Sequence, residues 1–223
     1  MHIPDGYLSP QTAGFFYAVM LPLWLSASRI TKRTLKARQV PYLAFSSSFT
    51  FIIMMFNIPI PGGSTGHAVG GTLCAVLLGP WAAMIAITVA LVVQALLFGD
   101  GGITAIGANC FNMAFALPFI GYLIYRLISR GSARDSIRRP IAAAIGAYFA
   151  LIAASALTGF EFGIQPMLHH TSDGRALYCP YGLDIALPIM VLEHALLFAW
   201  IEALITFAVI RYLQKEDPSL ITG

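Results

Sequence analysis

Residues 81–98 read WAAMIAITVALVVQALLF, a run without a single charged side chain. A membrane-spanning helix needs about 20 mainly apolar residues, within a range of roughly 17–25, and this run has that length. The rest of the chain has the same character, because 58% of its 223 residues are hydrophobic and only 10% are charged. Soluble domains carry charge on about a quarter of their residues. The composition therefore excludes two soluble domains and indicates one bundle of membrane helices.

Comparable apolar runs divide most of the remaining chain, and every break between them carries turn residues or charge. The predicted spans are 13–29, 41–57, 67–79, 81–98, 104–128, 141–160 and 187–211. The run at 67–79 is too short to cross a bilayer comfortably. Hydropathy alone therefore leaves six or seven crossings open.

The basic residues decide between these two counts. With seven crossings and the N-terminus outside, every one of the thirteen Lys and Arg residues except Arg175 faces the cytoplasm. A re-entrant segment at 67–79 would instead place the basic cluster at 126–139 outside, against the positive-inside rule. Because the charges flank the apolar spans, the net charge of +3 reports topology and not nucleic-acid binding.

We therefore predict an all-α integral membrane protein, a bundle of about seven transmembrane helices with the N-terminus outside and the C-terminus cytoplasmic. The chain is expected to form a single transmembrane domain over residues 1–223. Its predicted parts are a metal-chelating N-terminal segment at 1–12, a helical bundle at 13–211 and a cytoplasmic tail at 212–223.

The first residues contain candidate metal ligands. Met1 to Asp5 contain neither a basic region nor a following apolar core with a cleavage site, so we expect no signal peptide. Since His2 is bulky, we expect Met1 to be retained with a free amine. The Met1 amine, the His2 amide and the His2 imidazole can close two fused rings around one metal and leave a fourth corner open. Square-planar nitrogen coordination is typical of Ni(II) or Cu(II). The alternative is an ordinary histidine at a frayed end.

A fourth nitrogen donor is available at His67. It follows the Pro/Gly-rich stretch PGGSTG at 61–66 and lies on the same side as Met1 in the predicted topology. About ten residues reach roughly 33–36 Å when extended, so the N-terminal segment can fold back over the bundle. A histidine beside a membrane span is a functional candidate, although a neighbouring carbonyl can also satisfy such a side chain.

Three motifs resemble the NikM/CbiM family, the substrate-capture (S) components of energy-coupling factor transporters for nickel and cobalt in prokaryotic inner membranes. The motifs are MHIPDGYLSP at 1–10, PGGSTGH at 61–67 and GDGGITAIGANCFNM at 99–113. The resemblance covers essentially the whole chain, and the first motif is specific because it is long and begins at position 1. It implies a four-nitrogen site formed by the Met1 amine, the His2 amide and imidazole, and the His67 imidazole.

The expected transported substrate is Ni(II), with Co(II) as the alternative. Pro4-Asp5 resembles the nickel branch of the family more than the cobalt branch. The general affinity order also places Ni(II) above Co(II). Cu(II) would bind such a site more tightly still, so metal availability has to contribute to selectivity.

Several other polar residues are open to two interpretations. Asn109 and Asn112 can orient a ligand or tie helices together. Glu193, His194 and Glu202 in the last span can support the site or bridge helices. His169 and His170 can gather metal in an outer loop or simply be solvated. The cysteines are expected to be three unpaired thiols, at Cys74, Cys110 and Cys179.

The chain contains no Gly-x-x-x-x-Gly-Lys-[Ser/Thr] motif, so it does not hydrolyse ATP by that route and we expect no enzyme. The family resemblance implies a transmembrane coupling (T) component, ATP-binding cassette ATPases and possibly a small accessory membrane subunit as partners. Two other classes remain. An intramembrane metalloenzyme typically needs His-Glu-x-x-His, of which Glu193-His194 is only a fragment. A stand-alone ion-coupled metal carrier typically has repeats and midplane carboxylates, for which Glu202 is the one candidate.

Overall fold

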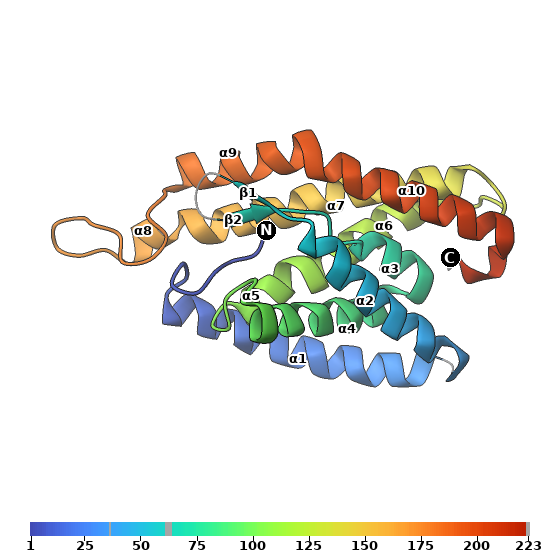
Figure 1. Ribbon diagram of the computed structural model, residues 1–223, viewed down its shortest axis with the longest axis horizontal. Coiled ribbons are helices and arrows are strands. Elements are labelled where there is room, and N and C mark those ends of the chain that lie inside the picture. The colour runs from blue at the N-terminus through green and yellow to red at the C-terminus, as the bar shows by residue number, and fades with distance from the viewer. Residues whose placement is uncertain (36, 61–63, 222–223) are drawn as a thin grey trace.

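A computed structural model describes residues 1–35, 37–60 and 64–221 of the chain. Lys36, which was predicted to face the cytoplasm, residues 61–63 of the Pro/Gly-rich stretch and the last two residues of the predicted tail lie outside this range. The helices run mostly along the long axis of the molecule (Figure 1). They are α1 (Pro10–Thr34), α2 (Val40–Met55), α3 (Gly71–Leu78), α4 (Pro80–Val93), α5 (Ile106–Asn109), α6 (Leu117–Ser129), α7 (Arg138–Gly163), α8 (Gln165–Leu168), α9 (Leu183–Glu193) and α10 (Ala199–Glu216).

Wider π-helical turns connect several of these helices into longer rods. They extend α4 at Gln94–Phe98, join α5 to α6 at Cys110–Ala116 and join α9 to α10 at His194–Phe198. Such turns often accompany functional sites, because they change the direction in which side chains project. Short 3-10 helices lie at Ala37–Gln39 and Pro218–Leu220.

Within the described residues, five helical rods are long and apolar enough to cross a membrane. They are Pro10–Thr34, Pro80–Phe98, Ile106–Ser129, Arg138–Leu168 and Leu183–Glu216. Helix α2 is a shorter apolar helix of 16 residues. The protein is therefore a multi-pass membrane protein by the character of its helices, while seven crossings and the sidedness of the termini stay predictions.

The predicted span at 67–79 is corrected by the structure. Only Gly71–Leu78 is helical there, because the glycines at both ends adopt positive φ angles, +76° at Gly70 and +84° at Gly79. Such backbone conformations interrupt an α-helix and favour glycine. Residues 67–70, between the preceding strand and α3, therefore form a loop, and His67 lies on that loop.

The chain just before His67 forms a small antiparallel strand pair, so the fold is not purely helical. Strand β1 (Ile58–Ile60) pairs antiparallel with β2 (Ser64–Gly66), and Ile58 lies opposite Gly66. In Figure 1 the N-terminus lies close to this hairpin, well inside the outline of the bundle. The chain before α1 therefore folds back from the start of that helix toward the middle of the molecule.

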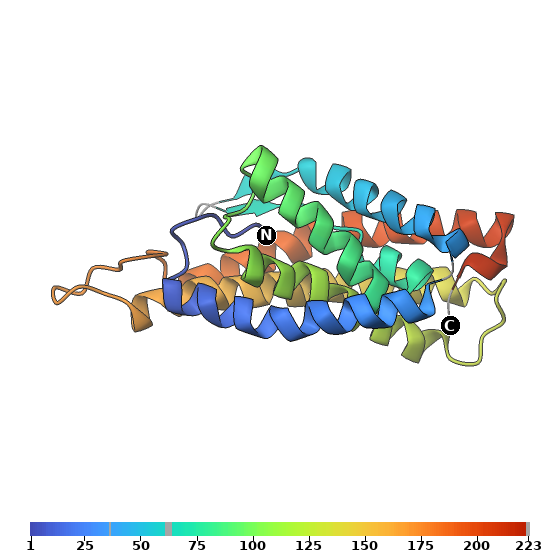
Figure 2. The same ribbon diagram turned by 90° about the horizontal axis from the view of Figure 1, so that it is seen from below.

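The two ends of the bundle differ in charge. Figures 1 and 2 show the C-terminus at one end, together with the connections that follow α1 and α6. Basic residues gather there, for example Arg33 in the last turn of α1, Arg126 in that of α6 and Lys215 in that of α10. The opposite end carries the connection between α8 and α9. The charge separation predicted from the sequence is thus present in the fold.

Candidate metal centre

The first three residues are buried, although they belong to no helix or strand. Met1 and Ile3 are fully buried and His2 is only 4% exposed. Helix α1 begins directly after Ser9, whose hydroxyl accepts a hydrogen bond from the Thr12 amide. This N-cap fixes where the helix starts and leaves residues 1–8 free to turn inward.

Backbone contacts hold this segment in an extended form. The Ile3 amide donates to Oδ1 of Asn109 at 2.8 Å, and Nδ2 of Asn109 donates to the Ile3 carbonyl at 3.1 Å. The Gly102 amide also donates to the Ile3 carbonyl, at 2.8 Å. A β-carbon on Gly102 would lie 2.4 Å from the Asp5 backbone nitrogen. The loop at 99–105 therefore needs a glycine at this point for the N-terminal segment to lie against it.

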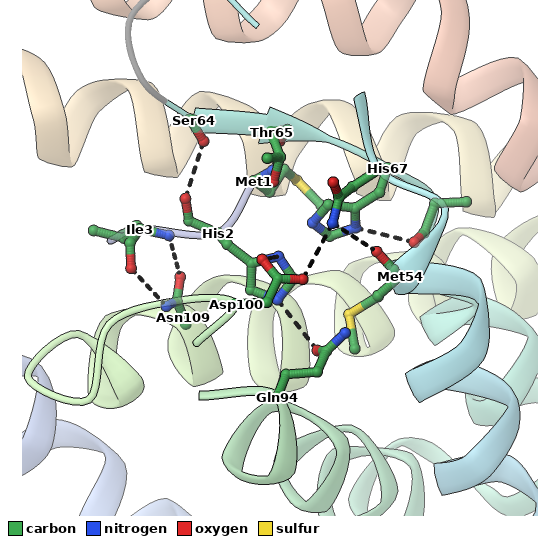
Figure 3. Close-up of polar contacts among 12 residues, drawn as sticks. Met1, His2, Ile3, Met54, Ser64, Thr65, His67, Gln94, Asp100 and Asn109 are labelled. Carbon is green, nitrogen blue, oxygen red and sulfur yellow. Dashed lines mark hydrogen bonds and ion pairs between the residues drawn. The ribbon is translucent and has the colours of Figure 1, made fainter. Parts of the chain in front are cut away.

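The imidazoles of His2 and His67 lie together inside the molecule (Figure 3). Their ring centroids are 4.6 Å apart and their planes are tilted by 32°. The Met1 nitrogen lies beside them and donates to the Thr65 carbonyl on β2. The hydroxyl of Ser64 on the same strand donates to the His2 carbonyl at 3.0 Å. The hairpin thus holds the segment that carries Met1 and His2 against His67.

Each imidazole is held through one of its nitrogens by a neighbouring oxygen. Nε2 of His2 lies 3.2 Å from Oε1 of Gln94, and Nδ1 of His67 lies 3.0 Å from the Ala68 carbonyl. Because these oxygens only accept, they favour the tautomers with the ring proton on those two nitrogens. The Asp100 carboxylate, 3.4 Å from Nδ1 of His2, favours the opposite tautomer of that ring. Nδ1 of His2 and Nε2 of His67 are both buried without a hydrogen-bond partner among the described residues, and each carries a free lone pair in the tautomer that Gln94 and Ala68 favour.

Burial also favours the neutral forms of the donors. It lowers the pKa of the Met1 amine to about 4 and that of His2 to about 3, and the neighbouring N-terminal charge contributes to the second shift. Nδ1 of His2 lies 3.4 Å from a carboxylate oxygen of Asp100. The lowered pKa of His2 favours a neutral imidazole over a charged pair with this carboxylate. A neutral nitrogen with a free lone pair is the form that binds a metal.

This arrangement brings together candidate nitrogen donors from both side chains and the backbone. Within the described residues, no group of three or more His, Cys, Asp or Glu side chains is placed to hold a metal ion. Here two donors are side chains, and the amine and amide of the first two residues can supply the others. Nitrogen ligands suit nickel, copper and related transition metals.

Comparison with known proteins agrees with this chemistry. The family model CbiM, described as the cobalt uptake substrate-specific transmembrane region, matches residues 2–220. The chain belongs to the CbiM family.

Relatives of this CbiM-family chain are named as metal transport proteins. It is 48% identical over 98% of its length to a probable fused nickel transport protein, LarMN, of Lactiplantibacillus plantarum. It is also 48% identical over 99% of its length to a fused nickel transport protein, NikMN, of Rhodobacter capsulatus. The chain spans 66% and 64% of these two relatives, respectively. The names are those of transporters rather than enzymes, and they fit the nickel branch of the family.

A solved structure shares the fold. A crystal structure of a truncated transition metal transporter superposes with a TM-score of 0.93 at 50% sequence identity, and the match covers 97% of this chain and 99% of that one. The arrangement of helices is therefore that of a transition metal transporter.

The two asparagines proposed as ligand-orienting residues occupy different places in this CbiM-family chain. Asn109 binds the backbone of Ile3, so it positions the N-terminal segment rather than an imidazole. Among the described residues, the hydrogen bonds of Asn112 go to Thr158 and Glu161 on α7, at 3.1 and 2.8 Å. The structure thus places Asn109 at the candidate site, and Asn112 in a separate buried polar cluster.

The remaining histidines and Glu193 are less directly placed. His194 is buried with Nδ1 2.7 Å from the Met190 carbonyl, and its Nε2 has no partner among the described residues. Glu193 is partly exposed on α9. His169 packs against the Tyr178 ring, and His170 is exposed beside the Pro166 carbonyl. Metal gathering by the last two and support of the site by Glu193 and His194 stay predictions.

Sequence reasoning did not single out Gln94 or Thr65. Gln94 is fully buried and holds His2, and Thr65 holds the Met1 nitrogen through its carbonyl. A signal for Gln94 was available, because it is the one amide side chain within the apolar run 81–98. No side-chain signal marks Thr65, since its contact is made by the backbone.

Proposed function

We propose that this chain is the substrate-capture component of an energy-coupling factor importer and that it binds Ni(II) from the outer side of the membrane. The ligands are the Met1 amine, the deprotonated His2 amide, Nδ1 of His2 and Nε2 of His67. These four nitrogens form a square plane. The protein carries the metal as its substrate and performs no chemical conversion on it.

One observation carries this proposal. Nδ1 of His2 and Nε2 of His67 are buried without a hydrogen-bond partner among the described residues, and they belong to rings whose centroids are 4.6 Å apart beside the buried Met1 nitrogen. A chelate that begins at the amine and continues through the amide closes its second ring through Nδ1 of His2. The free atom is therefore the one that the chelate requires. Gln94 and Ala68 hold the opposite nitrogens, as partners of metal-bound imidazoles commonly do.

Nickel is proposed over cobalt for two reasons. The relatives LarMN and NikMN are named as nickel transport proteins, and square-planar nitrogen coordination suits Ni(II). Co(II) is the alternative substrate, because the matching family model is described by cobalt uptake. Competition between the two metals for the purified protein separates these assignments.

The partners follow from what a capture subunit needs. Uptake against a gradient needs an energy source, and the sequence has no phosphate-binding loop of its own. We therefore propose that a transmembrane coupling component and two ATP-binding cassette ATPases work with this chain in the inner membrane of a prokaryote. Both fused relatives are longer than this chain, which supports an additional small membrane subunit.

The decisive experiment changes only the N-terminus. Protein that begins at Met1 and carries its purification tag at the C-terminus is compared with protein that has two extra residues before Met1. The extension converts the amine into an amide, so we expect stoichiometric nickel in the first protein and loss of tight binding in the second. Metal analysis after desalting measures both. The control variant His170→Ala, at an exposed position, should keep its nickel.

The spectrum of the bound metal tests the geometry independently. Four nitrogens in a plane make Ni(II) diamagnetic and give a yellow visible band. A paramagnetic, six-coordinate spectrum, or full nickel occupancy in the extended protein, would contradict the proposed ligand set.

A further inference from the structure

Glu202 is a buried carboxylate that the proposed ligand set does not use. It lies on α10, is only 1% exposed, and both of its oxygens accept hydrogen bonds from the backbone. The Val69 amide donates to Oε2 at 2.8 Å, and the Gly70 amide donates to Oε1 and Oε2 at 2.9 and 2.8 Å. These amides directly follow the loop residues His67 and Ala68.

The location of these amides explains why a carboxylate is tolerated there. Gly70 precedes α3, and Gly70 itself contributes no side chain to cap that helix. The first amides of a helix have no partner within it and attract negative charge. Glu202 therefore caps α3 from another helix, and the charge-assisted bonds offset much of the cost of burying a carboxylate.

The same rod of α9 and α10 also holds the other side of His67. A β-carbon on Gly66 would lie 1.9 Å from the ring of Phe198, so the strand residue before His67 is pressed against the π-helical turn at His194–Phe198. One turn further along the rod, Glu202 binds the backbone after His67. The loop carrying His67 is thus fixed on both sides by contacts with a single element.

We propose that Glu202 is a positioning residue for the metal site: by holding the backbone at Val69 and Gly70, it orients His67 so that Nε2 meets the nitrogens of Met1 and His2. This inference rests on the proposed function for its metal-binding consequence. In this role Glu202 acts on His67, the fourth ligand, and is not the midplane carboxylate of an ion-coupled carrier.

A double-mutant cycle tests this assignment. Glu202→Ala, and the milder Glu202→Gln, should weaken nickel binding by about 10–100-fold, as loss of a residue that orients a ligand typically does. If Glu202 acts through His67, the variant His67→Ala/Glu202→Ala binds nickel no more weakly than His67→Ala alone. A role in general packing would instead make the two losses multiply. Nickel titration of the purified, detergent-solubilised protein measures all four affinities.

Glu161→Gln is the matched control. Glu161 is 2% exposed on α7 and accepts from Asn112, so it is a comparably buried carboxylate whose hydrogen bond comes from Asn112 and not from the backbone of the His67 loop. We expect its nickel affinity to stay within about twofold of the unaltered protein. Similar losses for Glu161→Gln and Glu202→Gln would overturn the assignment, because buried charge in general would then be responsible.

A metal-free measurement separates this inference from the proposed function. Modification of His67 by diethylpyrocarbonate, followed by mass spectrometry, reports how accessible its imidazole is without nickel. The imidazole is fully buried, so we expect protection in the unaltered protein and in Glu161→Gln, and reaction in Glu202→Ala. If His67→Ala leaves nickel binding unchanged while Glu202→Ala exposes His67, the proposed ligand set fails and the positioning role stands. Protection of His67 in both Glu202 variants overturns the positioning role.

Discussion

Gln94 opposes Asp100 in setting which nitrogen of His2 carries the ring proton. Oε1 of Gln94 lies 3.2 Å from Nε2 of His2 and favours the proton there, whereas the Asp100 carboxylate lies 3.4 Å from Nδ1 and favours the opposite tautomer. Without Gln94, Asp100 would draw the ring proton to Nδ1, the nitrogen that the proposed chelate needs. Control of the tautomer by a neighbouring oxygen is general among metal-binding histidines.

Substitution of Gln94 should therefore weaken metal binding without touching a ligand. We expect Gln94→Leu to lower nickel affinity by about tenfold or more, because the apolar side chain fills the space but accepts no hydrogen bond. Gln94→Glu retains an acceptor and should bind nickel much more tightly than Gln94→Leu. Nickel titration of the three proteins checks this, with thermal unfolding as a measure of folding. Equal affinity of the leucine and glutamate variants would argue against the tautomer role.

The individual residues of the site differ in how far the sequence predicts them. Met1, His2 and His67 could be proposed from the sequence, because the chelate depends on chain position and on a histidine beside a turn motif. Thr65 and Ser64 contact the segment through orientations that only the hairpin defines. Glu202 could be noted in the sequence as an intramembrane carboxylate. Its hydrogen-bond partners could not be predicted, because they are backbone amides of another segment and no residue type identifies them.

At the level of elements, the N-terminal segment and the loop at 99–105 form one unit. Asp5 accepts hydrogen bonds from the Thr104 hydroxyl at 2.5 Å, from the Thr104 amide at 2.8 Å and from the Ile103 amide at 3.2 Å. The hydroxyl bond is the main reason why the pKa of Asp5 lies below its ordinary value of 3.8. The ionised carboxylate therefore fastens the segment to the loop.

This contact predicts a defined pH dependence. Because the pKa of Asp5 is lower in the folded protein, its stabilising effect is complete above the ordinary value of 3.8 and is lost as the pH falls through the lowered value. Asp5→Asn should speed amide hydrogen exchange at Ile103 and Thr104 at neutral pH, and this difference from the unaltered protein should shrink in acid. Asp173→Asn, which removes a threonine-bonded carboxylate from another loop, should leave these amides unchanged. An undiminished difference below the lowered pKa would contradict the role.

The sequence predicted the long helices well and the short elements poorly. Apolar length is a property of composition, so spans such as 81–98 and 141–160 are found within the observed rods. The segment 67–79 is also mainly apolar, yet glycines with positive φ confine its helix to eight residues. Its hairpin and loop depend on contacts with the N-terminal segment and α10, which are distant in sequence and carry no local signal.

At the scale of the whole molecule, the candidate site and the basic charge lie apart along the bundle. The N-terminal segment turns inward from the end that carries the α8–α9 connection, while the basic turns of α1, α6 and α10 lie toward the other end (Figures 1 and 2). Positive charge beside membrane spans is retained on the cytoplasmic side. This polarity supports the proposed capture of metal from outside.

Two exposed aspartates make this orientation testable. Asp135 lies in the connection after α6 and Asp173 in the connection after α8, so the rod Arg138–Leu168 separates them. The three native cysteines are buried and unpaired, which keeps background labelling low. We expect a membrane-impermeant maleimide to label Asp173→Cys in intact cells, but Asp135→Cys only after permeabilisation, because the basic residues around Asp135 resist translocation. The reverse pattern would place the α8–α9 connection in the cytoplasm and contradict capture from outside. Labelling of both from one side would show that α7 does not cross the membrane.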